Sequence, residues 1–182
     1  MTYKGYMDSM AECISQVDEN TVEQFAVILR QVKANRGRLF FLGVGGSAAN
    51  CSHAVNDFRK IAGIDAQTPV DNVSELTAYT NDVSFADCFV ESLVTSQLNS
   101  KDAICVFSVG GGSDKTSANI VNAIQFAKRV DAKVLGIVSR NGGFTKENAD
   151  VCINFCPEDS EVITPIAESL QVVFFHYLVN AI

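Results

Sequence analysis

The chain contains only two histidines, and each has a carboxylate at a spacing that could bring the two groups into one site. His53 is followed four residues later by Asp57, and His176 is preceded eight residues earlier by Glu168. Imidazole titrates near neutral pH and is the commonest metal ligand. The four side chains therefore indicate acid–base chemistry or a metal site. Acids near histidines are also common on protein surfaces. Whether these four side chains form one site therefore depends on the helices and strands that carry them.

Two loops rich in glycine and serine could also do chemistry. Residues 43–47 (GVGGS) and 108–113 (SVGGGS) each follow an apolar run and precede a helical pattern. In a parallel sheet such loops lie at the carboxyl ends of strands, where glycine and the N–H groups of the next helix can receive an anion. The two loops predict a site for a small phosphorylated molecule. Its phosphate is expected at Ser47, Ser108 and Ser117, and Ser117 is also placed to cap the following helix.

The spacing of apolar residues predicts the elements that would position these loops. Strands are expected over 38–43, 103–107, 134–138 and 151–155. Helices are expected over 3–35 (one or two), 48–61, 73–79, 85–98, 117–130 and 163–182. Alternation of strands and helices predicts an α/β fold with a parallel sheet covered on both faces and right-handed crossovers. The first and last helices carry more apolar surface than one small sheet needs, so we expect them to pack between subunits.

Composition narrows the classes of partner and compartment. The 182 residues are 47% hydrophobic with a net charge of −7, which predicts one packed domain and disfavours nucleic acid and anionic membranes as partners. No secretory signal is expected at the N-terminus, and no stretch is expected to span a membrane. The six cysteines have no CxxC pairing and are expected to be reduced, buried thiols of a cytoplasmic protein. For Cys152 and Cys156 a place in the core is favoured over a metal site.

Four segments taken together resemble a known family. They are FFLGVGGSAANCSHAVNDF (40–58), TNDVSF (80–85), the loop that begins at Ser108, and ESLQVVFFHYLV (168–179). In order and spacing the chain is similar to the sugar isomerase (SIS) domain, and within it to the phosphoheptose isomerases. The resemblance implies one SIS domain over 1–182, a doubly wound parallel sheet flanked by helices, with 1–36 as an N-terminal helical segment. It also implies a homotetramer with active sites between subunits, packed through the terminal helices.

The resemblance also implies a set of substrate-binding residues. The family's NGG triplet falls on Val44, Gly45 and Gly46, so its asparagine is absent here. The family's STSG loop falls on Ser108–Gly111, where Val109 and Gly110 lack the hydroxyls, and Lys115 is a candidate to supply a charge in their place. The residues expected to contact the sugar phosphate are Val44, Gly45, Gly46, Ser47, Asp57, Asn81, Asp82, Ser108, Val109, Gly110, Ser117 and Glu168.

The family's metal and catalytic positions, His, Glu, Gln and His, fall on His53, Asp57, Glu168 and His176. The implied cofactor is one Zn²⁺ per subunit, and the implied acid–base pair is Asp57 and His176, although a zinc-bound carboxylate is a weak base. The implied reaction interconverts D-sedoheptulose 7-phosphate and D-glycero-D-manno-heptose 7-phosphate, which supplies heptose for cell-surface polysaccharide. The alternatives are a regulatory SIS protein that binds a phosphosugar without catalysis, and an isomerase for a different sugar phosphate.

The spacing of Glu168 and His176 leaves one question open. On an unbroken helix the two would lie about 12 Å apart along the axis, too far for one ion. Either Glu168 precedes the regular helix, near Pro165, or the two residues act in different subunits.

Overall fold

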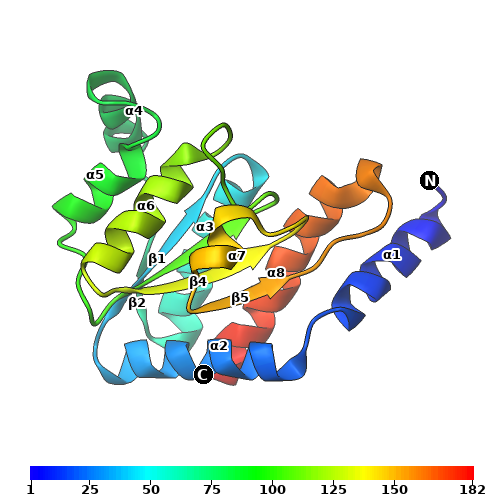
Figure 1. The fold of residues 1–182 in the computed structure, drawn as a ribbon. Helices are drawn as coiled ribbons and strands as arrows, with labels where there is room; N and C mark the ends of the chain where they lie inside the picture. Colours follow the sequence, from blue (N-terminus) through cyan, green and yellow to red (C-terminus); the bar gives the residue numbers. More distant parts are fainter.

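The structure is a computed structural model that describes residues 1–182, and a parallel sheet of five strands forms its centre (Figure 1). The strands are β1 (Arg38–Gly43), β2 (Asp65–Gln67), β3 (Ala103–Ser108), β4 (Lys133–Val138) and β5 (Val151–Asn154). Their order is β2-β1-β3-β4-β5. The order reverses between β1 and β3, so the loops that leave these two strands diverge to opposite faces and open a crevice at their carboxyl ends.

Eight α-helices surround the sheet, and several begin at the capping residues that the sequence offers. The helices are α1 (Tyr3–Ser15), α2 (Glu19–Ala34), α3 (Gly46–Asp57), α4 (Val73–Asp82), α5 (Cys88–Thr95), α6 (Ala118–Arg129), α7 (Gly143–Asn148) and α8 (Ile163–Ala181). The side chains of Thr2, Asp18 and Asn72 accept hydrogen bonds from the first turns of α1, α2 and α4. A π-helical turn, η1 (Phe58–Ala62), continues α3, and a 3₁₀ turn, η2 (Ser160–Val162), precedes α8.

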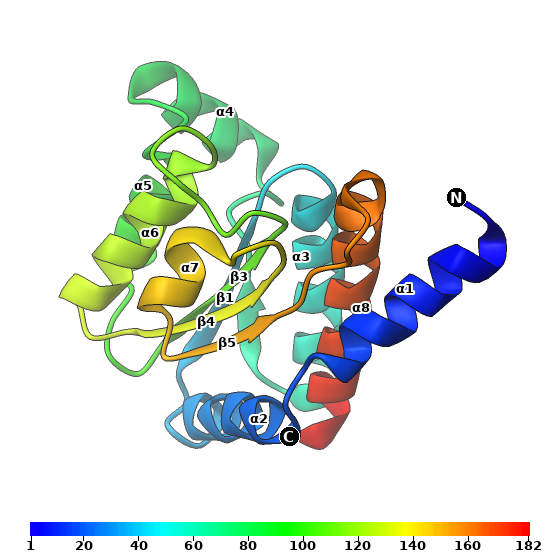
Figure 2. The ribbon, with the colours of Figure 1, turned by 45° about the vertical axis from the view of Figure 1, so that its right-hand side comes forward.

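Each face of the sheet carries its own apolar core. Alternate residues of β1 point to opposite faces, so Leu39 and Phe41 join the side of α2, α3 and α8, whereas Phe40 and Leu42 join the side of α5 and α6. Figure 2 shows the two helical layers on either side of the sheet, with α1 projecting from the body beside α8. The first core is the larger, with 29 buried residues against 14, because the long helix α8 belongs to it.

The expected α/β fold with a parallel sheet covered on both faces is confirmed, with two elements added. Strand β2 was not expected, because three residues with one apolar side chain give no recognisable pattern. Helix α7 was not expected either, because its first residue, Gly143, belongs to a glycine pair that is typical of a turn. Helix α4 extends three residues beyond the expected end at Tyr79, to Asp82. The remaining expected helices and strands are present with ends shifted by a few residues.

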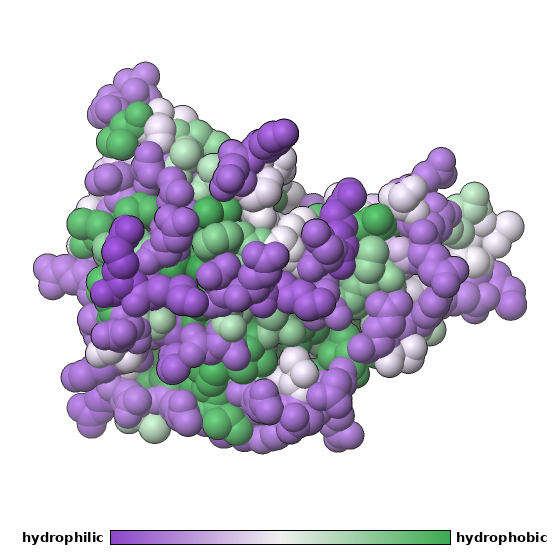
Figure 3. Space-filling view, in the orientation of Figure 1, coloured by the Kyte–Doolittle hydropathy of each residue, from purple (hydrophilic) through white to green (hydrophobic).

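No stretch was expected to span a membrane, and helix α8 is the one segment that is long and apolar enough to be a candidate. The helical segment Ser160–Ala181 reaches that length and hydropathy, yet 56% of its apolar stretch is buried inside the fold. It lies against α3 and the sheet, which explains its composition (Figure 1). Hydrophilic residues cover most of the face seen in Figure 3, with hydrophobic residues visible between them.

Four of the six cysteines lie in the apolar core as expected, whereas Cys152 and Cys156, also expected there, are only half-buried. Cys13, Cys51, Cys88 and Cys105 are buried and none of the six is paired. Burial raises the pKa of the Cys152 thiol to about 12 and that of the Cys13 thiol to about 11. Both therefore remain protonated near neutral pH, which makes them poor nucleophiles and poor metal ligands.

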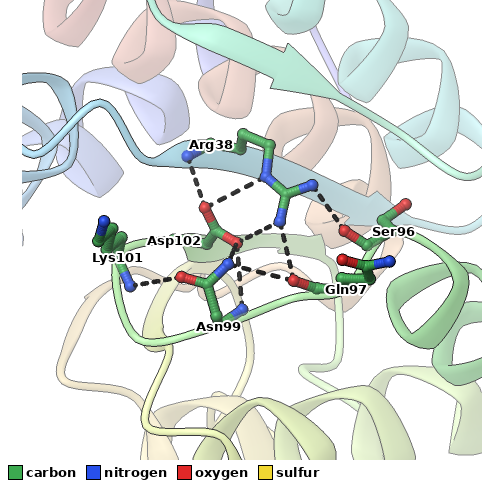
Figure 4. Close-up of polar contacts among 6 residues, drawn as sticks. All are labelled: Arg38, Ser96, Gln97, Asn99, Lys101 and Asp102. Atoms are coloured by element: carbon green, nitrogen blue, oxygen red, sulfur yellow. Dashed lines mark hydrogen bonds and ion pairs between the residues drawn. The ribbon is translucent and has the colours of Figure 1, made fainter.

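A partly buried ion pair between Arg38 and Asp102 joins the beginning of β1 to the residue before β3 (Figure 4). The Asp102 carboxylate, 2% exposed, accepts hydrogen bonds from the Arg38 backbone (2.8 Å) and from Arg38 Nη2 (2.7 Å). It also accepts from the backbone N–H and side-chain amide of Asn99 at 3.1 and 3.0 Å. The guanidinium donates further to the carbonyls of Ser96 and Gln97. This network sets the register of the two strands whose far ends carry the glycine-serine loops.

We predict that Asp102→Ala lowers the free energy of unfolding by about 3 kcal/mol, because it leaves the Arg38 charge and the Asn99 amides without their acceptor. Urea unfolding measures this loss. The control is Asp8→Ala, which breaks an exposed pair with Lys4 and should cost less than about 1 kcal/mol. A comparable loss for the two variants would show that the network does not hold the strands.

Candidate active site

Two imidazoles and a carboxylate meet where α3 packs against α8. His53 Nε2 lies 3.4 Å and His176 Nε2 lies 3.2 Å from the same oxygen of Asp57. The two histidine side chains are about half exposed, whereas that of Asp57 is 13% exposed. His53 also packs edge-on against the ring of Phe175, 5.0 Å away. The ligand atoms of the three residues lie within 4.8 Å of one another, which suits a metal ion or a proton relay. We call this group the His–Asp–His cluster.

Glu168 does not join that cluster within one chain. It lies inside α8, which begins at Ile163 and is unbroken, so the first of the two alternatives, that Glu168 precedes the regular helix, is excluded. Its carboxylate instead lies over the α-carbon of Gly46, where a methyl group would overlap it. Eight residues of helix separate it from His176, about 12 Å along the axis. The structure thus brings together three of the four expected metal ligands and places the fourth at the first glycine-serine loop.

A buried amide network holds that first loop to α8. The side chain of Gln171 is fully buried, and its Nε2 donates to Ser47 Oγ at 3.1 Å. Asn50 Nδ2 donates to Gln171 Oε1 at 2.9 Å and to the Glu168 carbonyl at 2.8 Å. Ser47, expected to face a phosphate, is thus already engaged inside the protein. The sequence analysis did not select Gln171 or Asn50. A polar residue on the buried face of a helix, such as Gln171 in α8, was the signal that could have revealed the network.

The second loop lines a polar cavity of about 500 Å³. The expected residues Ser108, Val109, Gly110 and Ser117 all line this cavity, and we call it the phosphate pocket. Ser108 Oγ accepts a hydrogen bond from the Gly111 backbone at 3.0 Å, which shapes the loop. Apart from glycines, the other residues that line the phosphate pocket are Ser113, Thr116, Arg140, Asn141 and Thr164.

Two expectations about the phosphate pocket need correction. Ser117 occupies the N-cap position of α6, but it is in a left-handed conformation and its side chain makes no capping hydrogen bond. Lys115, considered as a replacement charge, is exposed and does not line the cavity. Arg140, which the sequence analysis did not select, lines the cavity and brings a positive charge to it.

The first loop borders an apolar cavity rather than a polar one. Val44 and Gly45 line a space of about 310 Å³ with Leu76, Phe85 and Phe89. Asparagine at position 44 would have placed an amide there. The pair Asn81 and Asp82, expected to touch the sugar, lies exposed at the end of α4, where Asn81 Nδ2 donates to Asp82 Oδ1 at 2.8 Å. No hydrogen bond joins this pair to the His–Asp–His cluster or to the phosphate pocket.

Within one chain the phosphate pocket and the His–Asp–His cluster are separate places. Thr164, in the first turn of α8, lines the pocket, whereas His176 lies twelve residues further along the same helix. At 1.5 Å per residue that spacing is about 18 Å. The two parts therefore lie toward opposite ends of α8.

Comparisons with known proteins agree on a family. The SIS domain pattern matches residues 3–139. A lincomycin biosynthesis protein of Streptomyces lincolnensis is 33% identical over 150 residues, which are 78% of this chain and 54% of that protein, so the chain spans about half of that relative. A probable phosphoheptose isomerase of Thermoplasma volcanium is 27% identical over 187 residues, with 100% of this chain and 91% of that protein covered.

A solved structure has the same fold. The phosphoheptose isomerase of Neisseria gonorrhoeae superposes with a TM-score of 0.84 at 21% identity, covering 98% of this chain and 92% of the other. At this identity the likeness concerns the arrangement of elements. The fold is therefore shared over nearly the whole chain.

We predict that Gln171→Leu lowers the free energy of unfolding by about 1–3 kcal/mol, because Ser47 Oγ and Asn50 lose a buried partner. The control is Gln125→Leu on the exposed side of α6, which should change stability by no more than about 0.5 kcal/mol. Chemical unfolding of both variants measures the difference. Equal stability of the two would mean that the amide network is not a structural tie.

Proposed function

The chain belongs to the SIS domain family, and we propose that it isomerises a ketose phosphate to an aldose phosphate. The specific reaction we propose converts D-sedoheptulose 7-phosphate to D-glycero-D-manno-heptose 7-phosphate, a step toward heptose for lipopolysaccharide or capsule. Relatives named phosphoheptose isomerase match this chain over nearly its whole length, which supports this choice. The observation that carries it is the His–Asp–His cluster, because isomerisation needs a base and an acid within reach of adjacent carbons.

The chemistry sets the tasks of these side chains. A base removes a proton from C1 of the ketose while an acid protonates the carbonyl oxygen at C2, which gives an enediol. A proton then returns to C2 while the hydroxyl proton at O1 is released, and C1 becomes the aldehyde. We assign the carbon-bound proton to Asp57 and the oxygen-bound proton to His176. The close approach of His176 Nε2 to Asp57, 3.2 Å, supports their action as a pair.

A metal ion fits the same cluster by the chemistry of its donors. We propose that His53, Asp57 and His176 hold one Zn²⁺ per subunit, because two imidazoles and a carboxylate leave an open position of the kind found in catalytic zinc sites. With the ion bound, Asp57 would be a ligand and a weaker base, so these two uses of its carboxylate compete. When bound, the ion would polarise the substrate oxygens and stabilise negative charge on them. Glu168 could complete the set only from a partner chain, because within one chain its carboxylate lies at Gly46.

The phosphate pocket is the proposed place for the substrate's phosphate. Hydroxyls of Ser108 and Ser117 line it, together with loop backbone at Val109 and Gly110. The sugar would extend toward the loop of Val44, Gly45, Gly46 and Ser47, with Asn81, Asp82 and Glu168 as further contacts. These substrate contacts are proposals that follow from family positions and from the carboxyl ends of β1 and β3.

We further propose that the protein is a homotetramer with active sites between subunits. The separation of the phosphate pocket from the His–Asp–His cluster supports this proposal, because a neighbouring chain could bring one part to the other. Exposed apolar side chains on α1 and α8 offer a packing surface; they are Tyr3, Met7, Ile14, Val173 and Tyr177. We place the protein in the cytoplasm, and residues 1–182 as one SIS domain with 1–36 as its helical N-terminal segment.

An isomerase for a different sugar phosphate is the second candidate, and the apolar cavity at Val44 favours it. A substrate with a less polar end would suit this cavity better than a heptose would. Comparing kcat/KM for ketose phosphates of different length and hydroxylation distinguishes the two candidates. A regulatory SIS protein without catalysis would bind these compounds and turn over none.

We predict that the pure protein forms an aldose phosphate from sedoheptulose 7-phosphate, and that His176→Ala lowers kcat by about 10²–10⁴-fold. Because the His176 side chain is 46% exposed, the thermal midpoint of the His176→Ala variant should differ little from that of the unmodified protein. The control is Ser169→Ala, an exposed change on the same helix. If His176→Ala melts early but turns over normally when folded, the histidine is structural and the catalytic assignment is wrong.

We predict about one Zn²⁺ per chain when the protein is purified without a tag or chelator, measured by elemental analysis. His53→Ala should lose most of the zinc, because a ligand is removed. His176→Gln removes the second imidazole and should lose most of the zinc for the same reason. Glu168→Ala should retain the ion if the cluster of three suffices. Loss of zinc in Glu168→Ala would place that residue among the ligands, and an active protein free of metal would refute the zinc site.

A further inference from the structure

We propose that Arg140 is the cation that anchors the substrate's phosphate and makes the site prefer phosphorylated sugars over neutral ones. This inference deepens the proposed function and rests on it for the identity of the sugar. It is carried by three features of the phosphate pocket: its charge, the unpaired guanidinium and the rigid attachment of the turn that carries the arginine.

The first feature is that Arg140 is the single charged residue of the pocket. The other lining residues are serines, threonines, glycines, one asparagine and one valine, and none of them carries a carboxylate. A dianion that enters the cavity therefore meets hydrogen-bond donors and one positive charge, with no acid opposing it. The chain as a whole has a net charge of −7, so a cavity lined by one cation and no carboxylate differs in sign from the rest of the protein.

The second feature is that the guanidinium is free. Arg30, Arg38 and Arg59 each donate to a carboxylate of this chain. The side chain of Arg140 has no ion pair or hydrogen bond within the chain; only its backbone carbonyl is used, as acceptor from Asn154 Nδ2 at 3.3 Å. A guanidinium presents its donors in a planar fork that matches two phosphate oxygens. Arg140 lines the same cavity as five residues with hydroxyl groups, and its unpaired guanidinium is thus available to a phosphate.

The third feature is that the turn of Arg140 is joined to the second glycine-serine loop. Ser139 donates its backbone N–H to the Val109 carbonyl at 3.2 Å, and Phe144 donates to Gly112 at 3.0 Å. Thr145 donates twice to the Gly111 carbonyl, from its backbone at 2.9 Å and from Oγ1 at 2.7 Å. These bonds connect the carboxyl end of β4 to that of β3.

Glycine makes this close joining possible. A Cβ at Gly111 would overlap the Gly142 carbonyl, and a Cβ at Gly143 would overlap the Gly110 carbonyl. Arg140 itself has φ 55°, a left-handed conformation that a non-glycine residue adopts at a cost. The backbone therefore holds the arginine at one place relative to Ser108 and Ser117, and this place is the wall of the pocket.

The test measures phosphate binding and turnover in Arg140→Gln, which keeps a polar side chain without the charge. The control is Lys115→Gln, which removes a charge from the same loop region outside the cavity. Titration calorimetry with inorganic phosphate gives Kd, and steady-state kinetics with sedoheptulose 7-phosphate gives KM and kcat. Because a charge-assisted hydrogen bond is lost, we expect Kd and KM to rise about 10- to 100-fold in Arg140→Gln with kcat largely retained. Arg140→Lys should recover part of the loss, since the charge returns without the fork.

The outcomes separate this inference from the proposed function. A Kd for phosphate unchanged within about twofold in Arg140→Gln overturns the inference even if the enzyme is active. Equal losses in Arg140→Gln and Lys115→Gln overturn it as well, because they indicate a general effect of charge. Absence of phosphate binding in the unmodified protein also overturns it. If the unmodified protein binds phosphate through Arg140 but does not isomerise the sugar, the anchor stands and the proposed reaction fails. Thermal midpoints of the variants show whether each has folded.

Discussion

The packing of α3 against α8 is the contact on which the rest of the site depends. At one end it holds Ser47 and Asn50 to Gln171 through buried amide hydrogen bonds. At the other end it brings Asp57 between the two histidines. Both groups lie on the same seam because side chains three or four residues apart share a helical face. A slip of one helical turn, about 5.4 Å, would break the loop contacts and the His–Asp–His cluster together.

A second constraint is the close approach of the β3–α6 loop to the turn after β4. Only glycine fits where Gly111 faces the Gly142 carbonyl, and Thr145 fixes the join from a buried position. The first seam thus places the proposed acid–base or metal-binding groups, and the second places the residues proposed to bind the phosphate. Because the two groups lie toward opposite ends of α8, the proposed active site would combine parts of two chains. Exposed apolar side chains on α1 and α8 support the proposed homotetramer.

The sequence predicts the alternating fold because its strands are short apolar runs, three of them followed by a glycine-containing loop, and its helices have helical apolar spacing. It does not predict β2 or α7, which are too short to show a period. The spacing of four residues correctly predicted that His53 and Asp57 lie together. It could not show that Glu168 faces Gly46, because that contact depends on how α8 is rotated against α3. Arg140 was missed, although a cation before a glycine pair at the end of an expected strand was a usable signal.

The central claim is that this site moves a proton between adjacent carbons of a phosphorylated ketose. The most direct measurement is the conversion of sedoheptulose 7-phosphate in D₂O, with the product analysed by mass spectrometry and NMR. The account predicts one solvent deuterium bonded to C2 of the aldose, because the base exchanges its proton with solvent between the two transfers. Conversion without deuterium at C2 would contradict the acid–base role of Asp57 and His176, and recovery of unlabelled ketose alone would contradict the isomerase itself.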